Sequence, residues 1–257
     1  MKKIALALAL MFGFLLLSTP ALANNSNEVK TIEELHNMLL NKELISLNDD
    51  KKLIISQDAN NLEIDSSLFD YYKKRIESAN FAVGEGIAWY DENLQITFLP
   101  DEEITEKVYQ NYQIEKSLGL SGPISTMATV LDVKTMMDKN YRAVNSINTV
   151  GRVTIARAYW VGKVREGGAW DYKVVKGFSP WYKTFSMVLP NGSTETHNSK
   201  WLGNYNYGYT GRVVFNKTVL LIGGDLVGLG KNQKPDDAQA KDAIRRGYDH
   251  ANSFQKK

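Results

Sequence analysis

Two short runs in the C-terminal half of the chain combine polar and aromatic side chains, as a binding cleft would. In the first, Trp170 to Lys173, two aromatic residues alternate with an aspartate and a lysine. In the second, Asn204 to Gly208, two carboxamides lie among tyrosines and between flanking glycines. Glycines let a backbone approach a ligand, tyrosines offer stacking faces, and carboxamides offer hydrogen bonds. The residues that we expect to bind a substrate here are Trp170, Asn204, Tyr205 and Tyr207.

Asp171 and Lys173 are candidates for catalysis because they follow a predicted helix end. Gly167 and Gly168 stop the preceding apolar pattern, so Asp171 is expected on a loop that Trp170 holds in place. A carboxylate there could move a proton, and the lysine could stabilise an anion. The alternative is structural, with Trp170 anchoring the helix end while the two charged residues cap it and face water.

The second run has a structural alternative of its own, a tight Gly/Asn turn with aromatic packing across strands. Against this, buried carboxamides are costly without hydrogen-bond partners. We therefore expect Asn206, like Asn204, to bind a ligand through its carboxamide.

Two further charged or titratable residues complete the candidate site. His197 is the histidine nearest to the two runs and is our candidate general base, although a solvated hairpin arm is the plainer interpretation. Arg246 could bind a phosphate, although Asp242 lies four residues earlier and an exposed charged face explains the pair equally well. We find no zinc-binding spacing, nucleophile elbow, phosphate loop or dinucleotide fingerprint, so we expect neither a metal nor a cofactor.

The elements that must position these residues form an α+β chain with a break near residues 119–123. Before the break, a capping box at Thr31 and Glu34 starts a helix, and short hairpins alternate with further helices. We expect strands at 45–47 and 53–55, a helix over 66–79 after Asp65, a hairpin over 86–99, and a helix over 101–114.

Beyond the break the pattern is mainly helical. Helices are expected over 133–147 and 153–164, and an irregular segment over 171–201 contains one hairpin with its tip at residues 190–193. The apolar stretch 213–222 favours a helix, and Asp236 is expected to cap a last helix that runs to about Ser253. We thus predict a small α+β module over 24–120 and a mainly helical domain with a short hairpin over 125–257.

The first 23 residues have the features of a secretory signal: Lys2 and Lys3, an apolar stretch from Ile4 to Leu17, and an Ala-x-Ala site ending at Ala23. We expect Sec-dependent export with cleavage after Ala23, and no stable membrane insertion afterwards. Removing both lysines lowers Lys+Arg from 31 to 29, equal to the 29 Asp+Glu, so the predicted mature chain is about neutral. The chain has no cysteine, so it is expected to fold without disulfides. We also expect a monomer.

Three motifs in the C-terminal part occur in a recognisable order. They are Gly167-Gly-Ala-Trp-Asp-Tyr-Lys173, then Gly203-Asn-Tyr-Asn-Tyr-Gly-Tyr-Thr-Gly211, and then Asp236-Asp237 leading to Ile244-Arg-Arg-Gly-Tyr248. Together they resemble the type 44 domain of bacterial polymorphic toxins, over roughly residues 130–253. The resemblance implies a toxin domain of a predicted RNase class. The positions that it marks are Trp170, Asp171, Lys173, Asn204, Asn206, Tyr207, Asp237 and Arg246.

The chain departs from that family in two ways. The position of Asn206 is often histidine there, and asparagine cannot take up a proton near neutral pH, so a nuclease would need Asp171 or His197 as its base. Such toxin domains usually end long delivery proteins, whereas here a predicted signal and a small module precede the domain. An immunity protein is the partner that the resemblance implies.

Three functions stay open from the sequence. The first is an exported, toxin-like hydrolase of RNA; its neutral charge counts against it, because nucleases usually carry a basic surface. The second is an envelope enzyme that cleaves peptidoglycan or another glycan, with Glu166 or Glu195 paired with Asp171 as acid and base. The third is a non-catalytic secreted binding protein, which is favoured if Asp171, Lys173, Asn204 and Asn206 do not share one pocket.

Overall fold

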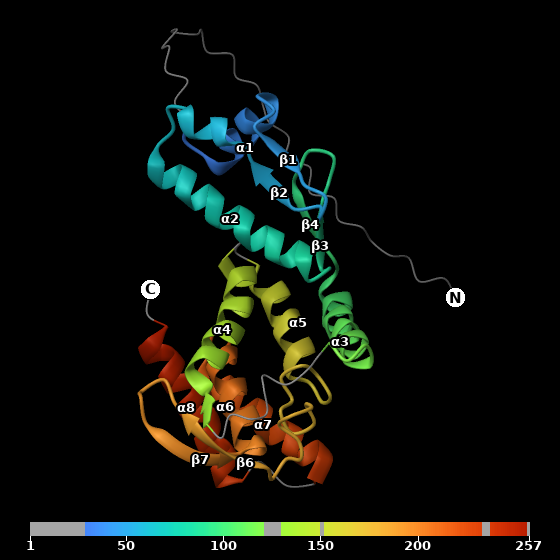
Figure 1. Ribbon diagram of the computed structural model, residues 1–257, viewed down its shortest axis with the longest axis vertical. Helices are drawn as coiled ribbons and strands as arrows, with labels where there is room; N and C mark the ends of the chain where they lie inside the picture. Colours follow the sequence, from blue (N-terminus) through green and yellow to red (C-terminus); the bar gives the residue numbers. More distant parts are fainter. Residues whose placement is uncertain (1–28, 121–129, 150–151, 233–236, 256–257) are drawn as a thin grey trace, which may run out of the picture.

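The computed structural model describes residues 29–120, 130–149, 152–232 and 237–255. Over these ranges it has eight α-helices and three small sheets, which confirms an α+β chain with a largely helical C-terminal part (Figure 1). The predicted signal sequence lies outside the described residues. Within them, no helix combines the length and the apolar character needed to cross a membrane.

The N-terminal elements begin where the cap residues predict. Thr31 accepts a hydrogen bond from the Glu34 amide at 3.1 Å while the Glu34 side chain accepts one from the Thr31 amide, which is the predicted capping box. Asp65 accepts from the Leu68 amide at 2.8 Å and starts a helix that runs on to Gly84 rather than ending at Ala79. The elements are α1 (Ile32–Asn41), β1 (Ile45–Leu47), β2 (Leu53–Ile55), the 3₁₀ helix η1 (Gln57–Asn61), α2 (Ser66–Gly84), β3 (Ala88–Tyr90), β4 (Ile96–Phe98) and α3 (Asp101–Ser117).

The C-terminal part packs helices against one three-stranded sheet. Its strand order is β5-β6-β7, with β5 parallel to β6 and β6 antiparallel to β7. The β6–β7 hairpin was predicted, but β5 was not, because a three-residue strand gives no periodic signal. The elements are β5 (Val130–Asp132), α4 (Val133–Thr149), α5 (Val153–Val164), β6 (Thr184–Val188), β7 (Thr194–Asn198), α6 (Ser199–Gly211), α7 (Lys217–Asn232) and α8 (Ala238–Phe254).

The apolar stretch 213–222 is helical only from Lys217, where α7 begins. Two further local predictions were wrong. The Asn204–Gly208 run is neither a turn nor an open ligand-facing segment: it is the middle of α6, which Asn198 caps by accepting from the Trp201 amide at 2.9 Å. Burial between α4, α8 and the hairpin overrides the low helix propensity of its glycines and asparagines. The cap of α8 is Asp237, not Asp236, and it accepts from the Ala240 amide at 2.7 Å.

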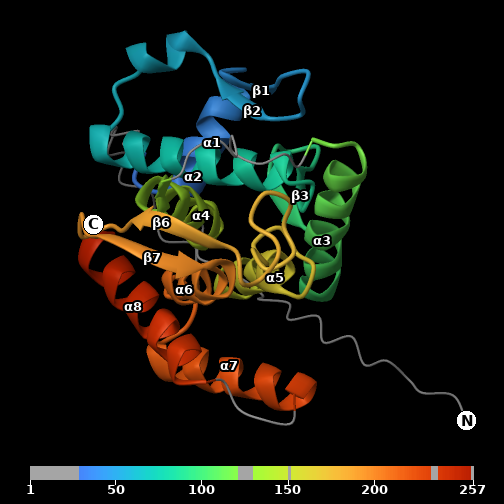
Figure 2. The same ribbon diagram turned by 60° about the horizontal axis from the view of Figure 1, so that its bottom comes forward.

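Glycines explain how closely α6 and α8 approach each other (Figure 2). A Cβ added at Gly208 would lie 2.1 Å from the Ile244 carbonyl oxygen, and one added at Gly247 would lie 2.1 Å from the Tyr205 carbonyl oxygen. Both distances are far below any real Cβ contact, so the two backbones meet where only glycine fits. The glycines of two of the recognised motifs therefore serve helix packing.

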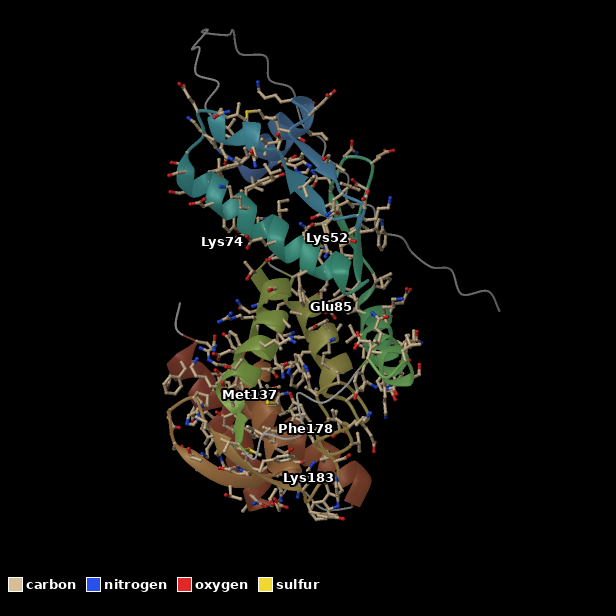
Figure 3. The ribbon with its side chains drawn as sticks, viewed as in Figure 1. Lys52, Lys74, Glu85, Met137, Phe178 and Lys183 are labelled. Carbon is tan, nitrogen blue, oxygen red and sulfur yellow. The ribbon has the colours of Figure 1, made fainter. Side chains whose placement is uncertain are left out.

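One hydrophobic cluster spans the proposed boundary near residue 120. It joins Ile104 and Val108 of α3 to Ile155 and Tyr159 of α5. At its edge, Lys163 Nζ lies 3.0 Å from Glu85 Oε2, at the junction that Figure 3 marks with Glu85. The two proposed modules thus share core packing, and their division is proposed from the sequence alone.

Candidate functional site

The loop after α5 uses Asp171 to hold its own backbone. Asp171 is only 6% exposed, and its Oδ2 accepts from the Gly167 amide at 3.0 Å. Trp170 is buried as well and donates its amide to the Lys163 carbonyl at 2.9 Å. Lys173 Nζ lies 3.5 Å from Asp171 Oδ1 and faces solvent. This geometry matches the structural alternative for Asp171 and leaves its carboxylate little access to a substrate.

Removing that carboxylate should therefore affect stability. Asp171→Ala is expected to lower the free energy of unfolding by about 1–3 kcal/mol, because it leaves a turn amide without its acceptor. Lys173→Ala is the matched control and should change it by less than about 1 kcal/mol, since the lysine is half exposed. Urea unfolding followed by circular dichroism measures both. Equal effects of the two substitutions would contradict this role.

The four motif residues of α6 point to different sides of the helix. Tyr205 is fully buried in one hydrophobic cluster, whereas the half-buried Tyr207 packs on Trp160 in another, with ring centroids 4.8 Å apart. Asn204 is half-buried, and Asn206 lies about half a turn away from it, with no exposed surface. The expectation that these residues line one substrate cleft is not met.

Asn206 belongs to a buried polar network. Its Oδ1 accepts from Asn140 Nδ2 at 2.9 Å, and the same Nδ2 donates to the Tyr172 hydroxyl at 2.9 Å. The Nδ2 of Asn206 is buried without a hydrogen-bond partner among the described residues. The network pins α4, α6 and the loop to each other, and a role for Asn206 in direct contact with substrate would need an opening of this core.

His197 and Arg246 meet on one carboxylate, Glu195. His197 Nε2 lies 2.9 Å from Glu195 Oε2, and Arg246 donates from Nη1 to Oε2 at 2.9 Å and from Nη2 to Oε1 at 2.7 Å. The side chains of Glu195, His197 and Arg246 are 31%, 16% and 27% exposed. These three residues, which we call the Glu195 cluster, come from β7 and α8 and reach solvent.

Electrostatics keep Glu195 ionised. The Arg246 hydrogen bonds, with smaller contributions from His197 and Ser193, lower the pKa of Glu195 from 4.5 to about 2. Because the pKa of this carboxyl is lower in the folded chain, its ionisation stabilises the fold at any pH above the ordinary value of 4.5. This contribution is lost as the pH falls from 4.5 toward 2. At neutral pH the cluster therefore contains a fixed carboxylate.

An aromatic row continues from the cluster into the core. The His197 ring stacks on Trp201, with centroids 3.7 Å apart and planes 6° apart, and Trp201 in turn stacks on Tyr205 at 4.8 Å. The Tyr205 hydroxyl lies 2.7 Å from His250 Nδ1. Burial, with a smaller effect of Arg246, lowers the pKa of His250, so this second histidine is neutral at neutral pH.

Asp237 stands apart from this cluster. Besides capping α8, it forms an ion pair with Lys200 at 2.6 Å, and this lysine is the main reason for its lowered pKa. It thus ties the start of α8 to the start of α6.

The predicted catalytic residues fall into separate places: Asp171 and Lys173 lie together on the loop after α5, and His197 and Arg246 meet at Glu195. The sequence motifs do not include Trp201, which contacts His197 and Arg246, or His250, which contacts Tyr205; they include Glu195 only as part of a glycosidase acid–base pair. A period of two along β7 puts Glu195 and His197 on one face, and four-residue spacing puts Arg246 and His250 on one face of α8. Those two spacings could have indicated the cluster.

Nothing in the described part of the chain groups three or more His, Asp or Glu side chains that could hold a metal ion. Comparison of the chain with models of protein families, with curated proteins and with solved structures finds no match.

Proposed function

We propose that the protein is an exported, toxin-like ribonuclease in which His197 transfers the proton. Glu195 orients the His197 ring, and Arg246 in turn holds Glu195 in place. The observation that carries the proposal is the Glu195 carboxylate, which binds both His197 and Arg246 at a partly exposed surface. A histidine oriented by a carboxylate is the arrangement that general acid–base catalysis requires.

The hydrogen bond assigns the histidine tautomer. Because the ionised Glu195 can only accept, His197 must donate from Nε2, which leaves Nδ1 as the basic atom. Within the described residues Nδ1 has no hydrogen-bond partner. In RNA, a base at this position would take the proton of a 2′-hydroxyl, whose oxygen attacks the adjacent phosphorus. The 5′-oxygen then leaves with a proton from an acid, and a 2′,3′-cyclic phosphate remains.

Arg246 supplies the charge that this reaction needs. Its terminal nitrogens both bind Glu195, but the guanidinium still carries three further N–H groups, and it is partly exposed. Its guanidinium carbon also lies over the Trp201 ring, 5.5 Å from the centroid, in a cation–π contact. A phosphate approaching His197 would meet this cation, which favours a phosphodiester over a neutral sugar as the substrate.

The Glu195–Asp171 pair supports the glycan alternative poorly. With its pKa lowered to about 2 by Arg246, Glu195 is a poor general acid, and Asp171 already accepts from the Gly167 amide. Two of the four residues on which the binding-protein alternative depends make internal contacts: Asp171 accepts from the Gly167 amide, and Asn206 is fully buried. What supports catalysis is the Glu195 cluster, which contains none of these four residues.

The direct test is cleavage of single-stranded RNA by the purified protein in the presence of EDTA. Arg246→Ala is expected to reduce the rate about 100-fold, because it removes the cation and frees Glu195. Arg245→Ala is the matched control: this arginine is the exposed neighbour on α8 and should leave the rate unchanged. Products are separated by gel and their 3′ ends examined for the cyclic phosphate.

The other possible results would support other functions. Equal losses for both arginines would indicate general charge rather than this site. Intact RNA together with solubilised peptidoglycan would support the envelope enzyme. Intact RNA and intact peptidoglycan would leave the binding protein.

A further inference from the structure

The N-terminal part contains a pocket that the proposed hydrolysis does not use. It has a volume of about 410 Å³ and lies between α1, α2 and the β3–β4 hairpin. Ligand pockets in proteins generally measure about 300–1,000 Å³ and combine apolar walls with a few fixed polar groups. This pocket therefore has the size of a small-molecule site.

Its floor is a buried polar pair with its hydrogen bonds already made. His36 Nδ1 lies 2.9 Å from the Tyr72 hydroxyl, and His36 Nε2 lies 3.0 Å from the Asn93 carbonyl. Since a carbonyl can only accept, Nε2 donates to Asn93, and both ring nitrogens of His36 are already in hydrogen bonds. Burial raises the pKa of Tyr72, so the phenol stays uncharged at neutral pH. The floor thus offers polar groups that are already paired with each other or with the backbone.

The walls are mainly apolar. Ile32 comes from α1, Ile76 and Ala79 come from α2, and Leu94 and Ile96 come from the hairpin. Tyr90 adds an aromatic ring, and its hydroxyl is already used as a donor to Asn80 at 2.9 Å. An aliphatic or aromatic body would replace water on these walls favourably.

Arg75 is the cation of this pocket. It is half-buried, its guanidinium lies 5.9 Å from the Tyr71 ring, and it has neither an ion pair nor a hydrogen bond among the described residues. Glu33, the one carboxylate in the lining, is exposed on α1. A guanidinium without a carboxylate partner beside an apolar wall is suited to a ligand anion.

We propose that this pocket binds a small molecule with an apolar, ring-sized body and one anionic group that pairs with Arg75. The proposal is independent of RNA hydrolysis, because none of its residues belongs to the Glu195 cluster. It gives the N-terminal module, which lies outside the family resemblance, a ligand-binding role of its own.

The test uses two fluorescent probes that differ mainly in the charged group. They are 1-anilinonaphthalene-8-sulfonate, which carries a sulfonate, and N-phenyl-1-naphthylamine, which lacks it. Each is titrated into the purified protein and into Arg75→Gln, Ile76→Trp and Lys74→Gln, with thermal melting to check the fold. Lys74 is exposed on the same helix and does not line the pocket, so it is the matched control (Figure 3).

The sulfonate probe should bind the parent protein and Lys74→Gln equally. Arg75→Gln should weaken it about tenfold through loss of one charge-assisted contact, and should leave the uncharged probe unaffected. Ile76→Trp should weaken both probes by filling the pocket. Unchanged sulfonate affinity in Arg75→Gln and Ile76→Trp would overturn the proposal, and so would a charged probe that binds no better than the uncharged one.

Discussion

Gly208→Ala should lower the free energy of unfolding by about 3 kcal/mol or more, a large share of the stability of a single domain. The new methyl carbon would lie 2.1 Å from the Ile244 carbonyl oxygen and 3.0 Å from the Ile244 Cα. Both atoms are backbone atoms of α8, so no side chain can rotate away and the two helices must separate. The higher intrinsic helix propensity of alanine offsets only about 1 kcal/mol of this cost.

The same helix provides the control. A Cβ added at Gly203 has the Tyr172 amide nitrogen as its nearest neighbour, at 4.0 Å, which is an ordinary contact. Gly203→Ala should therefore match or slightly exceed the parent stability, by up to about 1 kcal/mol. Chemical unfolding followed by near-ultraviolet circular dichroism, which reports the packed tyrosines of α6, compares the variants. A Gly208→Ala protein as stable as Gly203→Ala would show that the helices do not cross this closely.

These glycines also show what the sequence could and could not predict. The capping box at Thr31 and the N-cap at Asp65 act within a few residues, and the sequence predicts the helices that they start with small errors in length. Gly208 is explained by the backbone of Ile244 on α8, which is distant in the chain and close only after folding. Read locally, a segment of glycine, asparagine and tyrosine favours a turn, whereas tertiary burial makes it a helix.

The candidate site, too, could be predicted only where local sequence decides the structure. The polar tips of Trp170 and Asp171 on a loop predict binding, but the Gly167 amide, an internal partner, already uses the Asp171 carboxylate. The sequence indicates His197 and Arg246 as two separate candidates, and their common partner Glu195 joins them only because β7 lies against α8. Residue types indicated which groups could react, while the contacts between distant elements decide which of them are available.

Replacing His197 should have the largest effect on the proposed RNA cleavage. His197→Gln is expected to lower the rate about 100- to 10,000-fold, the range that a positioned acid–base group contributes. Glutamine can still donate an N–H to Glu195 and lie against Trp201, but its amide has no basic nitrogen to replace Nδ1. Initial rates with a defined oligonucleotide, measured as kcat and KM, should show the loss mainly in kcat, since the substrate-facing cation Arg246 is retained.

A purely structural role for the Glu195 cluster predicts a different set of results. If Glu195 served only to clamp β7 to α8, His197→Gln would keep both the clamp and full activity, whereas Glu195→Ala would lose stability first. Under the catalytic proposal, His197→Gln melts like the parent protein but is inactive, and Glu195→Gln loses part of the rate because a neutral amide orients the imidazole less strongly. Because Arg246 holds the pKa of Glu195 at about 2, the carboxylate stays ionised at neutral pH, and the losses measured there reflect the histidine and its orientation. Wild-type rates in His197→Gln would therefore assign the cluster to folding alone.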